Sequence, residues 1–329
     1  MCEVFAKDRF IRAHSDLKGN IKMLSRETEW VWDSWYVVDG QDLHAFYLMA
    51  PKSLEDPDLR HVNARVGHSI SRNGIDWEHL PEALGPSTGN EFDNQATWTG
   101  SIVKVDDTWH MFFTGINSET RERRQAVGHA VSSDLISWTR LSTAPIVSAH
   151  SPYSTLGNPR DGAEHFRDPW VFSQDGLWHM LVTANDEAGW GTIAHATSAD
   201  LNTWDLQEPL VTNSHLKQIE VTETLCIDGQ WVLLFCAGPT DIQREVSPTG
   251  FGTYCVPAEG PLGPFDLDRT ELLADEIYAA RAVFFNEKWI LLGFSDTGKP
   301  GGFTGVICDP IELTLSNRGT LELAELARR

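Results

Sequence analysis

The sequence predicts an all-β protein: a five-bladed β-propeller with four-stranded antiparallel blades, forming a single domain over residues 1–329. First, a unit made of an apolar strand, a two-residue polar turn and a Trp-bearing strand recurs five times. Second, an eleven-residue segment that ends in Trp follows three of these units. Third, successive turns lie 53 to 69 residues apart, a length that fits one four-stranded blade with one long loop.

The polar turns define the first hairpin of each expected blade. Asp and Gly suit such turns because Gly accepts a positive φ without a Cβ clash and Asp bonds nearby backbone. The strands after the turns are short and rich in aromatic and β-branched residues. In chain order the turns are Asp39-Gly40, Asp106-Asp107, Asp175-Gly176, Asp228-Gly229 and Asn286-Glu287, followed by DLHAFYLMA, TWHMFFTG, LWHMLVTA, QWVLLFCAG and KWILLGFS.

A second signature indicates the outer half of the blades. The segments at 67–77, 128–138 and 194–204 predict a third strand, a polar turn and an outer strand that begins at the Trp. The fourth unit has GTYCVPAEGPLGPF and the fifth has TGVICDPIELTL at this place. A blade cannot bury both faces alone, so stacked blades would share the core. The regular unit length disfavours a β-sandwich, and the long spacing disfavours a parallel β-helix.

Composition limits the partners. The net charge of −21 disfavours binding to nucleic acid or to a membrane surface, so a neutral small substrate fits better. We find no signal peptide and no run of 18 apolar residues, which predicts a cytoplasmic protein. The five cysteines form no CxxC pair, and no metal-ligand spacing is evident, so neither a metal nor another cofactor is expected. The sequence does not address the oligomeric state.

Three carboxylates fall at matched positions of the repeat. The strand before each turn should line the propeller axis, and its start should open onto a pocket. Asp33, Asp168 and Glu220 lie seven, eight and nine residues before the second residue of their turns. One such residue could simply cap a turn, but three at equivalent places favour a shared cavity. Gly100-Ser101 and residues 278–281 occupy this place in the second and fifth units.

Converging carboxylates suit the cleavage of a glycosidic bond. Like charges at short range raise one pKa, which yields a protonated acid beside an ionised base or nucleophile. Glycosidases use this division of labour. Trp32, Trp35, Trp98 and Arg167 flank the acids. The residues therefore predict a glycoside hydrolase that takes a small carbohydrate.

Several segments resemble motifs of glycoside hydrolase families 32 and 68, the invertase, fructanase and levansucrase group. The resemblance runs over the whole chain and implies a five-bladed fold and a retaining mechanism. It implies cleavage of the β-fructofuranosidic bond of a small fructoside, with hydrolysis favoured over fructosyl transfer. The segments are VWDSW (31–35), TWTGS (97–101), HFRDPWVF (165–172), IEVTETLCIDGQWVLLF (219–235) and GPLGPF (260–265, the closing strand of the fourth blade).

The resemblance assigns a role to each acid. It implies that Asp33 is the nucleophile, that Glu220 is the acid/base and that Asp168 stabilises the transition state. Glu223 is a weaker rival for the acid role. The implied substrate-binding residues are Trp32 and Trp98 as an apolar wall, Ser101 and Arg167 to position sugar hydroxyls and Asp33, Glu223, and the pocket tyrosine Tyr278.

The chain also departs from these families. Gln218 stands where family 68 has a carboxylate, and Gly238 where it has an aglycone-binding Arg, with Arg244 as a nearby substitute. The C-terminal β-sandwich of family 32 is expected to be absent. Two other functions stay open. One is an inverting family 43-like arabinofuranosidase or xylosidase, which shares the three-carboxylate layout, and the other is a non-catalytic sugar-binding propeller.

Other polar residues have simpler interpretations. His165 precedes the Arg-Asp-Pro motif and could orient Arg167. Arg281 could reach the pocket or pair with an acidic neighbour. Three histidines share one repeat position, which predicts packing or blade-to-blade bonding rather than a metal site; they are His68, His129 and His195.

Overall fold

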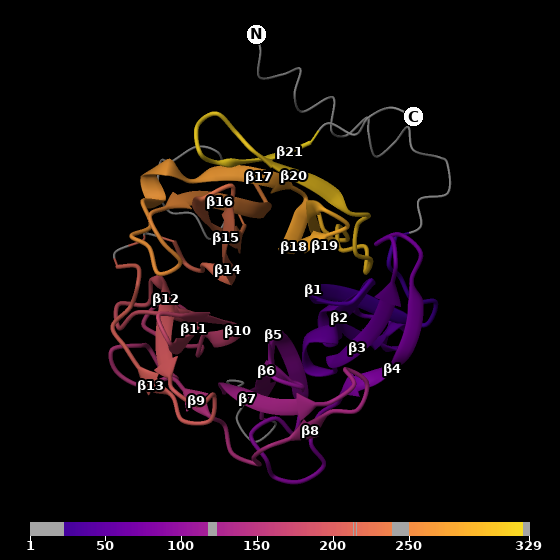
Figure 1. The fold of residues 1–329 in the computed structure, drawn as a ribbon. Coiled ribbons are helices and arrows are strands. Elements are labelled where there is room, and N and C mark those ends of the chain that lie inside the picture. Colours follow the sequence, from indigo (N-terminus) through magenta and orange to yellow (C-terminus); the bar gives the residue numbers. More distant parts are fainter. Residues whose placement is uncertain (1–22, 118–123, 213, 215, 239–249, 325–329) are drawn as a thin grey trace.

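Five antiparallel sheets stand around a central axis and form the five-bladed β-propeller that the sequence predicts (Figure 1). The last blade lies beside the first and closes the ring, where Val31 N–H donates to Gly305 O at 3.1 Å. The structure is a computed structural model, and it describes residues 23–117, 124–212, 214, 216–238 and 250–324.

Each blade has four strands in chain order from the axis outward. Blade 1 consists of β1 (Glu29–Asp39), β2 (Asp42–Pro51), β3 (Arg65–Ser71) and β4 (Glu78–Leu84); blade 2 of β5 (Ala96–Val105), β6 (Thr108–Ile116), β7 (Gln125–Ser132) and β8 (Thr139–Arg140), with β9 (Val147–Ser148) also paired to β7. Blade 3 consists of β10 (Phe166–Gln174), β11 (Leu177–Asn185), β12 (Gly191–Ser198) and β13 (Asp205–Leu206). Blade 4 consists of β14 (Glu220–Ile227), β15 (Gln230–Ala237), β16 (Gly252–Ala258) and β17 (Glu271–Asp275), and blade 5 of β18 (Ile277–Phe285), β19 (Lys288–Ser295), β20 (Ile311–Leu315) and β21 (Leu321–Leu323).

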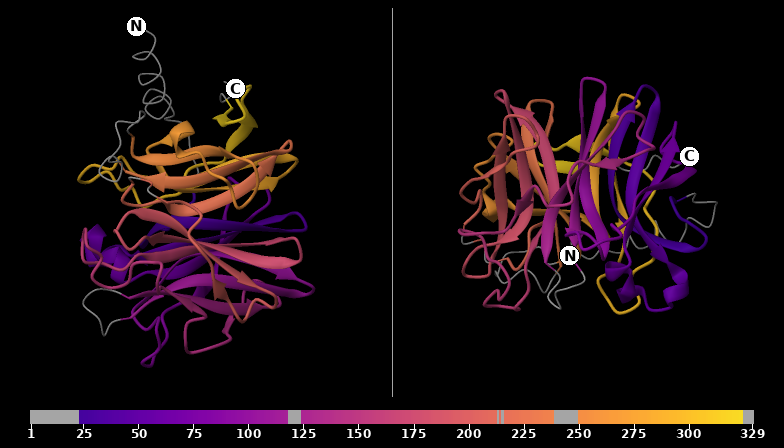
Figure 2. Two further views of the ribbon diagram at one scale, coloured as in Figure 1. Left: turned by 90° about the vertical axis from the view of Figure 1, so that its left-hand side faces the viewer. Right: turned by 90° about the horizontal axis from the view of Figure 1, so that it is seen from below.

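Helix is confined to three short 3₁₀ turns in the described ranges: η1 (Lys52–Leu54), η2 (Pro57–Val62) and η3 (Leu267–Arg269). No helix in these ranges is long and apolar enough to cross a membrane. Seen from two further sides, the blades pack face to face around the axis (Figure 2). Apolar side chains from facing sheets fill these interfaces, so each blade completes the core of its neighbours.

The repeated Trp segment forms the turn between the third and fourth strands. Asp134 accepts hydrogen bonds from the backbone N–H groups of Ile136 and Ser137 at 2.9 and 2.7 Å. The Trp138 indole then donates to Leu135 O at 2.9 Å. Asp200 and Trp204 repeat this arrangement in blade 3. Short polar side chains that bond their own backbone explain why this segment turns in several blades.

Two outer strands differ from the prediction. Residues 260–265, expected to close blade 4, form a loop whose Phe265 makes a single bridge to Ala258, and the outer strand is β17 instead. Prolines at 261 and 264 explain this difference because they cannot donate to a strand ladder. In blade 5 the third strand begins only at Ile311, and the Leu-Glu-Leu of the expected tail forms β21.

Every inner strand contains a β-bulge at the same level of the axis. A bulge adds residues to one strand, bends it and redirects a side chain. At the bulges, Asp33, Asp168, Val221 and Ala279 have positive φ values of 21°, 60°, 51° and 49°. The register shifts lie between Trp32 and Ser34 in β1, Trp98 and Gly100 in β5, Arg167 and Trp170 in β10, Glu220 and Glu223 in β14, and Tyr278 and Arg281 in β18.

The repeated histidines pack inside the blades. In each of the first three blades, Nδ1 of a second-strand histidine lies 2.9 Å from Nε2 of a third-strand histidine. Bonding is therefore within a blade rather than between blades. Across the described residues, no group of three or more His, Cys, Asp or Glu side chains is arranged to hold a metal ion. The pairs are His44–His68, His110–His129 and His179–His195.

Candidate active site

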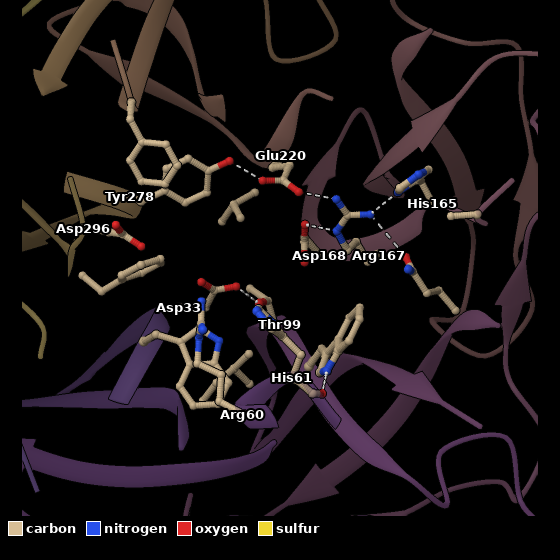
Figure 3. A pocket seen from close by; sticks show the side chains of 18 of the residues that line it. Asp33, Arg60, His61, Thr99, His165, Arg167, Asp168, Glu220, Tyr278 and Asp296 are labelled. Atoms are coloured by element: carbon tan, nitrogen blue, oxygen red, sulfur yellow. Dashed lines mark hydrogen bonds and ion pairs between the residues drawn. The ribbon is translucent and has the colours of Figure 1, made fainter. Parts of the chain in front are cut away.

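One end of the axis opens into a cavity of about 470 Å³ to which all five blades contribute (Figure 3). The three carboxylates singled out in the sequence, Asp33, Asp168 and Glu220, all line it. Each comes from an inner strand at or beside the bulge, so the repeat position correctly predicts their convergence. Trp32, Trp98, Arg167 and Tyr278, expected to bind substrate, also line this cavity.

Asp33 has a mixed environment. The Thr99 hydroxyl donates a hydrogen bond of 2.5 Å to Asp33 Oδ2. Burial and the charges of Asp168 and Glu220 nevertheless raise the pKa of Asp33 to about 7. The Thr99 hydrogen bond and the nearby Arg60 charge act in the opposite direction. Asp33 is thus poised between its neutral and ionised forms near neutral pH.

Asp168 is held more rigidly than Asp33. Its side chain is buried, and Oδ2 accepts a hydrogen bond of 3.0 Å from the Thr183 hydroxyl. Its backbone N–H donates to Thr114 Oγ1 at 2.9 Å. Burial and the Glu220 charge raise the pKa of Asp168, while Arg167, 3.5 Å away, opposes the rise. This acid is fixed on both its backbone and its carboxylate.

Glu220 is the best-paired acid of the pocket. Arg167 Nη2 forms a short ion pair with Oε1, and the Tyr278 hydroxyl donates a short hydrogen bond to Oε2. Burial alone would raise the pKa of Glu220, but the Arg167 charge and these hydrogen bonds outweigh burial and lower it. Both carboxylate oxygens of Glu220 therefore have protein partners, and the ionised form is favoured.

Arg167 is oriented by the histidine that precedes it. Arg167 Nη1 donates to His165 Nδ1 at 2.9 Å, and Nη2 donates to Gln218 Oε1 at 3.1 Å. The predicted role of His165 is confirmed by this contact. Arg167 pairs with Glu220 and lies near Asp168, so the expectation that it positions Asp33 is wrong.

Thr99 makes the Asp33 contact that was expected of Ser101. The Ser101 side chain is 1% exposed, and its hydroxyl accepts a 3.1 Å hydrogen bond from Val171 N–H. The bulge explains the error because it places Thr99, and not Ser101, opposite Asp33. The next residue, Gly100, must be a glycine, because a Cβ there would lie 2.1 Å from a backbone oxygen of the next strand.

Glu223 points away from the cavity. It is 2% exposed, and Oε2 accepts a hydrogen bond of 2.9 Å from Ala282 N–H in blade 5. Burial raises its pKa to about 7, against the nearby charge of Arg281. Its expected contact with substrate, and its rivalry for the acid role, are contradicted by this position. Arg281 is also buried and does not line the cavity; its Nη1 donates to Thr222 O at 2.6 Å, and the nearby charge of Glu223 favours its ionised form without an ion pair between the two side chains.

Sequence reasoning missed several residues that line the cavity. Thr99 could have been found, because it stands at the same repeat position as Asp33. Arg60 and His61 come from η2, a turn between β2 and β3 that no other blade repeats in the described chain, so no repeat signal marks them. Asp296 follows the second strand of blade 5. Arg244, a candidate for the aglycone side, lies outside the described residues.

Carboxylates that converge in one pocket, one of them paired with an arginine and another bonded to a hydroxyl, are typical of a glycoside hydrolase, which acts through two carboxyl groups. The chain belongs to this class through its sequence family as well. The chain is a member of glycosyl hydrolases family 32, since the sequence model of the family's N-terminal domain matches residues 32–279.

Individual relatives are distant. A bifunctional 6(G)-fructosyltransferase/2,1-fructan:2,1-fructan 1-fructosyltransferase of Allium cepa is 32% identical over 135 residues, covering 38% of this chain and 20% of the relative. A sucrose-6-phosphate hydrolase of Pediococcus pentosaceus is 27% identical over 183 residues, covering 55% and 34%. The chain thus matches only about a third or less of these curated relatives.

Solved structures share the fold. A GH32 beta-fructofuranosidase of Bombyx mori superposes with a TM-score of 0.72 at 20% identity, covering 98% of this chain and 70% of the other. An inulosucrase of Halalkalicoccus jeotgali bound to kestose gives a TM-score of 0.73 at 19% identity, covering 94% and 93%. These similarities confirm the propeller architecture across nearly the whole chain.

Proposed function

We propose that this chain hydrolyses the β-fructofuranosidic bond of a small fructoside with retention of configuration. The observation that carries this proposal is the convergence of Asp33, Asp168 and Glu220 in one cavity of a family 32 propeller. Two similar proteins, a sucrose-6-phosphate hydrolase of Pediococcus pentosaceus and a raffinose invertase of Escherichia coli, act on fructosides and support the same substrate class.

Asp33 is the nucleophile in this proposal. Thr99 occupies Oδ2, so Oδ1 attacks the anomeric carbon of the fructosyl group. The bond from that carbon to the leaving oxygen breaks, and Glu220 transfers its proton to the leaving oxygen. Water then attacks the anomeric carbon of the covalent fructosyl-enzyme and gives a proton to Glu220. The bond from that carbon to the Asp33 oxygen breaks, and the Asp33 carboxylate is regenerated. Asp168, fixed by Thr183, holds ring hydroxyls as positive charge develops.

The protein groups alone favour the reverse of the required ionisation, because burial raises the pKa of Asp33 while Arg167 and Tyr278 lower that of Glu220. Interacting acids titrate as a group, and the reactive microstate has the proton on Glu220 and the charge on Asp33. A bound sugar favours this microstate, since its leaving oxygen accepts from Glu220 in place of the Arg167 and Tyr278 partnership. We therefore expect proton redistribution to accompany substrate binding.

Hydrolysis, rather than fructosyl transfer, is the reaction that we propose, as the sequence predicts. The cytoplasmic location expected from the sequence stays a prediction, which cell fractionation would test. Glu223 is left out of the catalytic set. The substrate-binding set consists of Trp32, Trp98, Arg167 and Tyr278.

The decisive experiment measures sugar release from sucrose, kestose, inulin, levan and aryl arabinosides. Release of fructose, with proton NMR showing that the first product keeps the configuration of the substrate, is the expected result. An inverted first product or preferential cleavage of arabinosides would favour the family 43-like alternative. Binding of these sugars without any product would favour a non-catalytic propeller.

A further inference from the structure

Arg60 occupies an unusual place for a cation. It is the one buried residue of η2, the short turn inserted between β2 and β3. Asp56 caps this turn by accepting a 2.9 Å hydrogen bond from Asp58 N–H. The turn directs the Arg60 side chain inward, where it lines the same cavity as the acids. A cation is thus built into the wall of an acidic pocket.

Packing fixes the guanidinium more than ion pairing does. Its Cζ lies 4.0 Å from the centroid of the Phe303 ring and 5.8 Å from that of Trp32. Nη1 donates to Pro57 O at 2.9 Å, while the Asp58 carboxylate is 3.4 Å away and 92% exposed. An exposed partner contributes little. Stacking on aromatic rings therefore holds the plane of the guanidinium in place.

Two donors of Arg60 are left over. Nε is buried and Nη2 is not, and neither has a hydrogen-bond partner among the described residues. Because Arg60 lines the cavity, a molecule bound there would supply an acceptor for Nη2, the donor that is open to it. The aromatic packing leaves the donor little freedom to turn elsewhere.

The position relative to Asp33 identifies the acceptor. Figure 3 shows the guanidinium of Arg60 pointing toward the Asp33 carboxylate. The charge of Arg60 lowers the pKa of Asp33. The two groups form no hydrogen bond within the described chain. A fructosyl ring attacked by Asp33 and packed on Trp32 would place its hydroxyls beside Arg60.

We propose that Arg60 is a substrate-binding residue whose Nη2 donates to a hydroxyl of the fructosyl ring held over Asp33. The inference rests on the proposed fructosidase activity and adds a specificity-determining residue to it. Arg60 is absent from the motifs by which the sequence resembles its families. The ligand group is an uncharged ring hydroxyl, since Asp33 and Asp296 on the same side of the cavity disfavour an anion there.

The test compares Arg60→Met, which keeps the length of the side chain, with the matched control Arg65→Met. Arg65 pairs with Glu82 at 3.1 Å outside the cavity. The substrates are the best fructoside of the wild type and its versions lacking one fructosyl hydroxyl each. For Arg60→Met we expect kcat/KM to fall about 10- to 100-fold, as when a hydrogen bond from a charged donor is lost. The control should stay within about threefold, because exposed pairs contribute little.

The deoxy substrates separate binding from a structural role. For one of them the wild type should lose a similar factor, while Arg60→Met loses almost nothing further because its partner is already absent. Arg60→Lys should recover part of the activity, and Arg60→Gln provides a second variant if Arg60→Met does not fold. Equal sensitivity of wild type and folded variant to every missing hydroxyl would overturn the inference alone. A wild type that cleaves no fructoside would overturn the proposed function and the inference together.

Discussion

The Thr99 hydroxyl donates a 2.5 Å hydrogen bond to Asp33 Oδ2, and the two residues occupy the same bulge position on the neighbouring inner strands β5 and β1. This bond favours the ionised form of Asp33, which burial and two neighbouring carboxylates oppose. Thr99→Val should therefore raise the pKa of Asp33.

The expected result for Thr99→Val is an acid limb of the kcat/KM profile that moves to higher pH by about one unit. The direction follows because Asp33 reacts as the carboxylate, so activity is lost as pH falls through its pKa. Thr99→Ser keeps the hydroxyl and should restore the wild-type profile. An unmoved limb in a folded Thr99→Val variant would show that another group sets it.

Asp33→Asn should remove the nucleophile and lower kcat by about 10⁴-fold or more. Fructose release from the best substrate of the wild type measures this loss. Asp39→Asn is the matched control: Asp39 is on the same strand, but lies 3.5 Å from Lys104 on the surface. If Asp33→Asn is as active as the wild type, the nucleophile lies elsewhere.

Glu220→Gln and Glu223→Gln should behave in opposite ways. Glu220→Gln removes the acid/base, so kcat should fall about 10²- to 10⁴-fold, and less for an aryl fructoside whose leaving group needs no proton. Glu223→Gln should keep most activity but lower the free energy of unfolding by about 1 to 3 kcal/mol, because the buried cation of Arg281 loses the negative charge near it. Activity assays and thermal melts of both variants check this contrast. The reverse pattern would make Glu223 the acid.

Tyr278→Phe should change the basic limb of the profile. The Tyr278 hydroxyl lowers the pKa of Glu220, so its removal should raise that pKa by up to about one unit. Glu220 must be protonated to act as an acid, and the basic limb of kcat/KM should therefore move to higher pH. Tyr153→Phe, whose hydroxyl bonds Gln207 O far from the cavity, is the control. If the wild type, Tyr278→Phe and Tyr153→Phe lose kcat/KM at the same basic pH, the role of Tyr278 is contradicted.

The buried histidine pairs predict a pH-dependent stability. Burial and the neighbouring ring lower the pKa of His68 to about 3 and that of His129 to about 4. The unfolded chain, with His pKa near 6.5, then binds more protons between about pH 4 and 6.5. These pairs stabilise the fold fully above pH 6.5, and the contribution shrinks as pH falls through that window.

Asp33 and Glu223, whose pKa values are raised, act in the opposite direction over the same pH range, so a difference between proteins is needed. A double variant, His110→Gln with His129→Phe, removes one titrating pair. Its Tm relative to that of the wild type should increase as pH falls from 6.5 to 5. A constant difference across this range, or imidazole NMR signals that titrate near pH 6.5, would contradict the prediction.

The blades could be predicted because their turns are encoded locally. Asp134 and Asp200 bond their own backbone, and each repeat therefore marks its turn wherever the tertiary structure places it. The outer strands of blades 4 and 5 could not be predicted, since motif likeness favoured residues 260–265, whereas the prolines there prevent pairing. The strand that forms, β17, carries no repeat signature.

The site was predictable where it follows the repeat. Asp33, Asp168 and Glu220 could be placed by counting back from the turns, but the bulges could not be counted, because an extra residue reverses the face of each side chain after it. This is why Ser101 and Glu223 were assigned to a cavity that they do not line. Arg60 was invisible because it sits on an insertion present in one blade.

The left-handed residue of the bulge also has a consequence for how such a pocket is altered. Val221 adopts the same backbone conformation as Asp168 and lines the cavity, yet it carries no functional group. The bulge therefore forms whether or not the residue at this position has a catalytic side chain. Substitution of Val221 by a polar residue would place a new functional group on a backbone that already has the conformation of Asp168. Position 221 is therefore a site at which evolution or protein engineering could change the chemistry of the pocket.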